Sequence, residues 1–213
     1  MLRVLTALFI ITQTTVAFAQ TDWKLKNEKD GIKVYVGAVP DSKFKAIKVE
    51  CELNSTLSQL VKVLLDIKTC PEWVDHTKSC TLVKQVSPSE LYYYSEINIP
   101  WPAQNRDFVA HLTVRQNPNT KVVTVDGPAV EGFVPEKDGV VRVHSSKGLW
   151  ILTPVKKDVV KVIYTLQTDP GGAIPAWLVN MLVASGPMKS FQALKLELKK
   201  PEYQHIELSF IKD

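Results

Sequence analysis

The sequence Tyr-Tyr-Ser-Glu-Ile-Asn-Ile-Pro-Trp-Pro-Ala-Gln-Asn-Arg-Asp-Phe-Val occupies residues 93–109 and predicts two strands joined by a proline-rich turn. The first strand is expected over Leu91 to Ile99 and the second over Asp107 to Arg115, with Pro100-Trp101-Pro102 between them. Proline fixes the backbone and removes a hydrogen-bond donor, so it suits a turn better than the middle of a sheet. Because the connection is short, the two strands are expected to pair antiparallel.

Segments of similar pattern lie on both sides of this hairpin. In the segment that begins at Gly31, apolar residues alternate with polar ones, as in a half-buried strand. Asn54-Ser55-Thr56 is expected to begin a short helix that ends before Pro71. The loop from Gly127 to Gly139 is long and irregular, which makes it a candidate lid. Further strands are expected at residues 43–53, 80–86, 122–125, 140–144, 148–154 and 159–168.

The C-terminal part changes to helical spacing. Apolar residues recur on one face from Ile174 to Leu198, which predicts an amphipathic helix of about 25 residues, kinked at Gly186-Pro187. Antiparallel strands followed by one long helix predict a single α+β domain with the helix-grip fold, in which a curved antiparallel sheet wraps around the C-terminal helix. This pattern is compatible with an internal hydrophobic cavity and equally with a filled two-layer core.

Composition excludes several classes of protein. The chain has 213 residues, of which 45% are hydrophobic and 23% charged, and this balance is typical of a globular domain. Its net charge of +4 is small and its lysines are spread along the chain, which argues against a nucleic-acid partner. There is no apolar run of about 18 residues, the length that a membrane-spanning helix requires.

The first nineteen residues have the pattern of a secretory signal peptide. Arg3 precedes an apolar run from Val4 to Ile11, and Ala17-Phe18-Ala19 supplies the small residues of a cleavage site. We therefore expect cleavage near Ala19 and one domain over residues 20–213, in a secreted or periplasmic protein.

Residues suited to catalysis or metal binding are few. None of the four histidines stands at metal-ligand spacing from another histidine or cysteine, so neither a metal nor a cofactor is expected. Asp66, Asp75 and His76 are a weak candidate for an acid–base group, because charges near a helix end usually serve solvation and capping. Cys70 and Cys80 flank one short segment and either form a disulfide or remain unpaired thiols.

Aromatic residues are the stronger signal. Tyr92-Tyr93-Tyr94 lies in one strand and Phe108 in the next, while Trp150 and Trp177 come later in the chain. Such side chains commonly fill a core, and they also line pockets for amphipathic ligands, because the ring packs while its polar tip orients a head group.

Three stretches together resemble the START family, the steroidogenic acute regulatory protein-related lipid-transfer domains. They are residues 93–109 quoted above, Gly-Leu-Trp-Ile-Leu-Thr-Pro at 148–154, and Asp-Pro-Gly-Gly-Ala-Ile-Pro-Ala-Trp-Leu-Val-Asn at 169–180. The resemblance covers residues 23–200 in the right order. It implies a helix-grip fold whose curved sheet and C-terminal helix enclose one lipid.

Two ligand-binding patterns of the family are missing from this chain. Cholesterol-binding members of the family carry a buried Glu–Arg pair on adjacent strands. The matching positions in this chain are Tyr93 and Leu112. Members that bind phosphatidylcholine have an Arg and an Asp around a loop tryptophan, and the matching positions here are Cys70 and Val74. Neither ligand can therefore be assigned by resemblance.

The resemblance implies which strand faces point inward and therefore a set of residues around the ligand. Arg106 and Asp107, at a strand start, are expected to be structural ion-pair and turn residues rather than ligand contacts. The expected cavity-lining residues are Leu91, Tyr93, Ser95, Phe108, Ala110, Leu112, Trp150, Trp177, Met181 and Met188.

The function expected from this resemblance is non-catalytic binding and transfer of a lipid or sterol-like molecule by a monomer that contacts membranes transiently. The alternative is a cyclase- or hydrolase-like enzyme acting on a hydrophobic substrate in the same cavity, with Tyr93, His111 and His144 as candidate acid–base residues. The two hypotheses differ in whether these three side chains face the cavity.

Overall fold

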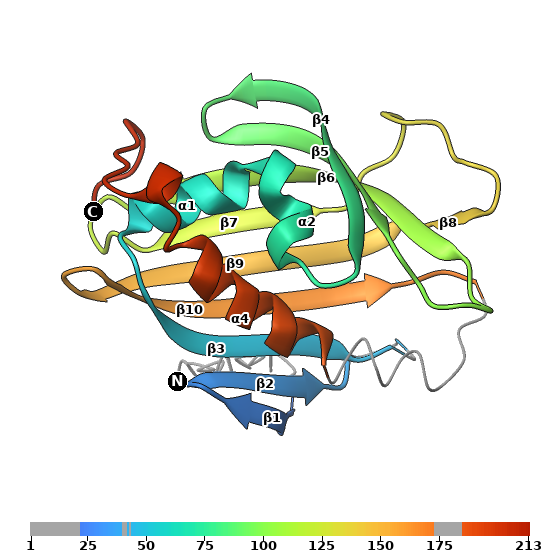
Figure 1. Cartoon of the computed structure of the whole chain (residues 1–213), viewed down its shortest axis with the longest axis horizontal. Helices are drawn as coiled ribbons and strands as arrows, with labels where there is room; N and C mark the ends of the chain where they lie inside the picture. Colours follow the sequence, from blue (N-terminus) through green and yellow to red (C-terminus); the bar gives the residue numbers. More distant parts are fainter. Residues whose placement is uncertain (1–21, 40–41, 43, 173–184) are drawn as a thin grey trace, which may run out of the picture.

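The structure, a computed structural model, describes residues 22–39, 42, 44–172 and 185–213. A curved sheet of ten strands forms one layer, and the helices α1, α2 and α4 lie across one of its faces (Figure 1). Within the described part of the chain, no helix is both long and apolar enough to cross a membrane. The strands are β1 (Trp23–Lys29), β2 (Ile32–Gly37), β3 (Ala46–Asn54), β4 (Thr77–Ser87), β5 (Glu90–Ile97), β6 (Asn105–Gln116), β7 (Val123–Pro128), β8 (Val140–Arg142), β9 (Ser145–Lys156) and β10 (Val159–Asp169). The helices are α1 (Leu57–Leu65), α2 (Cys70–Trp73) and α4 (Gly186–Glu197), with 3-10 turns at Ile67–Thr69 and Pro201–Tyr203.

The sheet has the strand order β1-β2-β3-β10-β9-β7-β6-β5-β4, and every neighbouring pair along this path is antiparallel. The short strand β8 pairs in parallel with the start of β6. A curved antiparallel sheet covered on one face by a C-terminal helix is the helix-grip fold, as predicted.

The hairpin of β5 and β6 has the register that the sequence predicts. Tyr93 pairs with Ala110, Leu91 with Leu112, and Ser95 with Phe108. Directly paired residues of antiparallel strands share a face, so all six side chains lie on the face of the sheet that the helices cover. In the turn between the strands, the Asn105 side chain accepts a hydrogen bond from the Ile99 backbone at 3.0 Å.

The first helix follows from its cap and its apolar spacing. The Thr56 hydroxyl accepts a hydrogen bond from the Gln59 backbone at 3.1 Å, as an N-cap residue does. Leu57, Leu60 and Leu64 are buried against the sheet. Pro71 does not simply end this helix: after a 3-10 turn it lies in the first turn of the additional short helix α2, where proline is well tolerated.

The long C-terminal helix can be compared with the structure only from residue 185 onward. Helix α4 begins at Gly186-Pro187, where the sequence predicts a kink, and it buries Phe191 and Leu194 against the sheet. The expected first half of the helix, residues 174–184, lies outside the described residues.

The loop predicted as a lid lies on the other face of the sheet. Its Phe133 ring stacks on Tyr92, whose side chain points away from the helices, with ring centroids 4.3 Å apart. The carbonyls of Val134 and Pro135 accept hydrogen bonds from buried Arg142 at 3.0 and 3.1 Å. These contacts hold the loop against the outer face, so the prediction that it covers a binding site is wrong.

Candidate functional site

The concave face of the sheet and the helices enclose a cavity of about 360 Å³. Its wall comes from strands β3 to β7, β9 and β10 and from helices α1, α2 and α4. The sequence is compatible with either an internal cavity or a filled two-layer core. The structure has the cavity.

Aromatic rings form the middle of this wall. Trp150, on β9, packs against Tyr164 on the neighbouring strand with ring centroids 4.4 Å apart, and stacks on Phe191 of α4 at 5.3 Å. Trp73 of α2 meets the edge of Trp150 at 6.3 Å. The Trp150 indole therefore joins the sheet wall to two helices across the cavity.

Five of the residues predicted from the sequence line the cavity. The Tyr93 and Phe108 rings meet edge to face at 5.9 Å on the sheet wall. Burial raises the pKa of the Tyr93 phenol well above its usual value, so this group is a neutral hydroxyl at physiological pH. The five residues are Tyr93, Ser95, Phe108, Leu112 and Trp150.

Three other predicted residues do not line the cavity, although each is buried. Leu91 packs in the hydrophobic core beyond the end of the cavity. The Ala110 side chain is a single methyl group that stays close to the sheet, beside the bridge to Ala129. Met188 lies about 100° around the helix axis from the cavity-lining Pro187 and packs in the core. Trp177 and Met181 lie outside the described residues.

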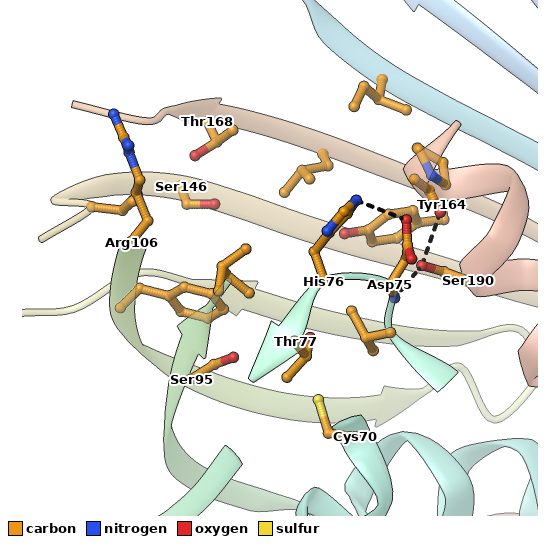
Figure 2. A pocket seen from close by; sticks show the side chains of 18 of the residues that line it. Cys70, Asp75, His76, Thr77, Ser95, Arg106, Ser146, Tyr164, Thr168 and Ser190 are labelled. Carbon is orange, nitrogen blue, oxygen red and sulfur yellow. Dashed lines mark hydrogen bonds and ion pairs between the residues drawn. The ribbon is translucent and has the colours of Figure 1, made fainter. Parts of the chain in front are cut away.

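A polar group that the sequence suggested only weakly lies at one end of the cavity. Asp75 and His76 line it, with His76 Nε2 3.3 Å from Asp75 Oδ2 (Figure 2). The Asp75 backbone donates a hydrogen bond to the Ser190 hydroxyl on α4 at 2.9 Å. Within the described residues, the neighbouring Thr77 hydroxyl is buried without a hydrogen-bond partner.

The other polar end of the cavity contains Arg106, near Ser146 and Thr168 (Figure 2). Asp107, the next residue, faces the opposite side of the sheet and forms its ion pair with Arg142 at 2.7 Å. The expected structural ion pair is therefore present for Asp107, whereas Arg106 faces the cavity and donates to the backbone carbonyls of Gln104, Pro170 and Gly171, because adjacent residues in a strand point to opposite faces. Burial lowers the pKa of the Arg106 guanidinium from its usual value.

The two cysteines that the sequence leaves either paired or free are both free thiols in this structure. Cys70 lines the cavity, and its thiol hydrogen-bonds to the Cys80 thiol. This bond lowers the pKa of Cys80, while the same bond and burial raise the pKa of Cys70. Cys80 Sγ also lies 3.4 Å from the Ser95 hydroxyl.

The two histidines proposed for the enzyme alternative lie away from the cavity. His111 Nε2 lies 2.7 Å from a Glu90 carboxylate oxygen, and its ring stacks on Tyr92 on the outer face. The His144 ring is more than half exposed and contacts Glu131 at 2.9 Å. Among the described residues, no cluster of three His, Cys, Asp or Glu side chains is arranged to hold a metal ion.

Fold and cavity together define a helix-grip protein with an internal apolar binding site. A family model described as START domain matches residues 11–202. The chain is 32% identical over 185 residues to the uncharacterized protein PA1579 of Pseudomonas aeruginosa, a match that covers 84% of this chain and 88% of the relative. The chain belongs to the START domain family.

Two further relatives carry functional names. The phosphatidylcholine transfer protein of Rattus norvegicus is 29% identical over 175 residues, which cover 80% of this chain and 80% of that protein. The crystal structure of the STAR-related lipid transfer protein from Xanthomonas axonopodis matches with a TM-score of 0.76 and 35% identity, covering 84% of this chain and 99% of the other.

Proposed function

We propose that the protein binds a lipid or sterol-like molecule in the cavity and carries it without changing it chemically. The observation that carries this proposal is the cavity of about 360 Å³ between sheet and helices, whose centre is lined by Trp150, Tyr93 and Phe191. Moving hydrocarbon from water into such a site stabilises the complex by about 0.8 kcal/mol per CH₂. The names of the relatives that transfer phosphatidylcholine and other lipids support the same function.

The geometry argues against an enzyme. His111 and His144 lie outside the cavity, and the Tyr93 phenol is neutral. The Asp75–His76 pair is the one acid–base pair among the described lining residues, and a hydrolase would need a nucleophile beside it. The Ser190 hydroxyl, which accepts a hydrogen bond from the Asp75 backbone, already donates its own proton to the Gly186 carbonyl at 3.0 Å.

We further propose that residues 1–19 are a cleaved signal peptide, so that the mature protein acts as a secreted or periplasmic monomer. Exchange of the ligand then requires brief contact with a membrane. Trp101, at the tip of the β5–β6 hairpin, is 90% exposed, and tryptophan is typical of membrane–water interfaces. Ile97 and Ile99 of the same hairpin line the cavity, so this turn adjoins the binding site.

A cavity-filling substitution tests the carrier function. Leu112→Trp places an indole in the space that the ligand would occupy, and a hollow site accommodates it with a loss of less than about 1 kcal/mol, whereas overpacking a filled core costs about 1–3 kcal/mol. We expect native mass spectrometry after incubation with a total bacterial lipid extract to show bound lipid on the wild type and little on Leu112→Trp.

Thr113→Trp is the matched control, because the neighbouring side chain faces the other side of the sheet. It should retain bound lipid. Lipid on Leu112→Trp at the wild-type level, or no lipid on the wild type, would contradict the proposal.

A further inference from the structure

Arg106 is a buried cation at the wall of an otherwise apolar cavity. Only 5% of its surface is exposed, and it lines the cavity close to Ser146 and Thr168. Its position follows from the strand: β6 turns Phe108 and Leu112 toward the cavity, and Arg106 has the same parity. A charge in this position loses most of its hydration, which is costly unless another charge or strong hydrogen bonds replace it.

No carboxylate compensates this charge among the described residues. The Arg106 guanidinium donates only to backbone carbonyls, those of Gln104, Pro170 and Gly171, and the last two bonds are long, at 3.4 Å each. Arginine has five N–H donors, so two of them have no partner in the described part of the structure.

The charge of the second buried arginine, Arg142, is compensated by a carboxylate. Arg142 donates two hydrogen bonds to the Asp107 carboxylate, at 2.7 and 3.2 Å, on the outer face of the sheet. The pKa of Arg142 is raised by that carboxylate, whereas burial is the single cause acting on Arg106 and lowers its pKa. The two arginines are about equally buried, at 8% and 5% exposed. Only the one at the cavity lacks an anion.

The surroundings of Arg106 suit an anionic group attached to a hydrocarbon. The hydroxyls of Ser146 and Thr168 line the same end of the cavity (Figure 2). Thr168 donates a long hydrogen bond to the Ser145 carbonyl, at 3.4 Å, whereas the Ser146 hydroxyl is able to donate to anionic oxygens. Beyond them the wall is apolar, with Leu166, Val125 and Trp150. The guanidinium fork binds carboxylate and phosphate oxygens in pairs, which adds orientation to the electrostatic attraction.

We propose that Arg106 binds the anionic head group, a carboxylate or phosphate, of an amphiphile whose hydrocarbon part fills the cavity. This inference rests on the proposed function and adds the ligand class to it. Asp75 lies with the separate polar group at the start of β4 and does not pair with Arg106. A neutral ligand would leave the Arg106 charge buried and uncompensated.

The test compares two probes that differ only in charge. The fluorescent fatty acid cis-parinaric acid and its methyl ester share one hydrocarbon chain, and titrations at pH 8 give the affinity of each. We expect the acid to bind the wild-type protein at least tenfold more tightly than the ester. Equal affinities would overturn the anion site while leaving the carrier function intact. If neither probe bound, the proposed function itself would fail.

Variants then assign the effect to one side chain. Arg106→Gln should weaken binding of the acid at least tenfold and leave the ester unchanged, and Arg106→Lys should restore part of the preference for the acid. Arg115→Gln is the matched control, since Arg115 is exposed at the far end of the same strand. An equal loss for acid and ester in Arg106→Gln would show a purely structural role, namely support of the turn at Pro170 and Gly171.

A competition experiment separates a lipid head group from a free anion. Inorganic phosphate at 10 mM should leave the affinity for cis-parinaric acid unchanged, whereas dodecyl phosphate should displace the acid. Displacement by inorganic phosphate would assign the site to free anions and overturn the proposal. If Arg106→Gln does not fold, the comparison of acid and ester on the wild type still decides the question.

Discussion

Arg142 Nε donates to Asp107 Oδ1 at 2.7 Å, and this ion pair ties strand β8 to strand β6 beneath the outer loop. Both side chains are buried, and the Tyr94 hydroxyl donates a further hydrogen bond to the same carboxylate at 3.1 Å. The pair thus holds in place the loop that packs on the outer face, through the contacts of Arg142 with Val134 and Pro135.

Replacing Arg142 by Met should therefore destabilise the protein strongly. Asp107 would remain buried without its cation, and breaking a buried pair on one side costs about 3–5 kcal/mol. The free energy of unfolding, measured with urea, tests this expectation. Lys33→Met is the control, because the Lys33–Glu28 pair is about half exposed and 3.8 Å apart, and such pairs contribute about 0–1 kcal/mol. Similar losses for the two variants would contradict the role of the buried pair.

The three thiols should differ in reactivity under reducing conditions. The thiolate is the reactive form, and the pKa of Cys80 is lowered by its hydrogen bond with Cys70. Burial raises the pKa of Cys51 to about 12, and the Cys80 contact and burial raise that of Cys70. We expect iodoacetamide at pH 8 to modify Cys80 first and Cys51 last, as measured by peptide mass spectrometry over time.

Removal of the partner thiol provides the control for this order. Cys70→Ala deletes the hydrogen bond that stabilises the Cys80 thiolate, so alkylation of Cys80 should become slower although its surroundings become more open. Faster alkylation of Cys80 in this variant would mean that access, rather than the hydrogen bond, sets its rate.

The sequence predicts well what depends on local periodicity. The prediction of which side chains of β5 and β6 face inward is correct. A strand has a two-residue period, so each side chain can lie on only one of two faces, and the paired rows of apolar residues identify the inward face. The sequence does not predict strand β1, because Trp23–Lys29 is a largely exposed edge strand whose apolar alternation is limited to Trp23 and Leu25 and is followed by polar residues to the end of the strand.

The polar ends of the cavity could not be predicted in the same way. Asp75 and Ser190 are 115 residues apart in sequence and meet because α4 packs against α2 and the residues that follow it. Asp107 forms its ion pair with Arg142, 35 residues away, and local periodicity contains no information about such a distant partner. Leu91 and Ala110 have the correct face, but where the cavity ends depends on side-chain packing that periodicity does not contain.

Stability should fall in acid partly through Glu96. Hydrogen bonds from Lys78 at 2.7 Å and Asn105 at 2.8 Å lower the pKa of this buried carboxyl below its usual value of 4.5. A carboxyl whose pKa is lower in the folded than in the unfolded protein stabilises the fold above the unfolded value, and this contribution is lost as pH falls through the folded value. The stabilisation by Glu96 is therefore complete at pH 6, begins to decline as pH approaches 4.5, and is lost as pH falls through the lower pKa of the folded protein.

The substitution Glu96→Gln tests this assignment. The variant should be less stable than the wild type at pH 6, and the difference in urea midpoint should shrink as pH is lowered from 6 to 3. Glu28→Gln, on the exposed edge strand, should follow the wild type throughout. A gap between Glu96→Gln and wild type that stays constant over this range would show that the carboxyl acts through its shape and not through its charge.

Trp101 provides the last prediction, which concerns the approach to a membrane. Its ring is 90% exposed at the tip of the β5–β6 hairpin, next to cavity-lining Ile99, so burial in a bilayer interface would place the cavity at the lipid surface. Trp101→Ala should remove about 1–2 kcal/mol of membrane affinity, which corresponds to about five- to thirtyfold weaker binding to phosphatidylglycerol vesicles in a sedimentation assay.

The control is Val155→Ala, because Val155 is an exposed apolar residue near the β9–β10 turn at the opposite end of the molecule (Figure 1). Because the ligand would still fit the cavity, binding of cis-parinaric acid by Trp101→Ala should equal that of the wild type. Vesicle binding that falls equally in both variants would show that the β5–β6 turn has no special part in membrane contact.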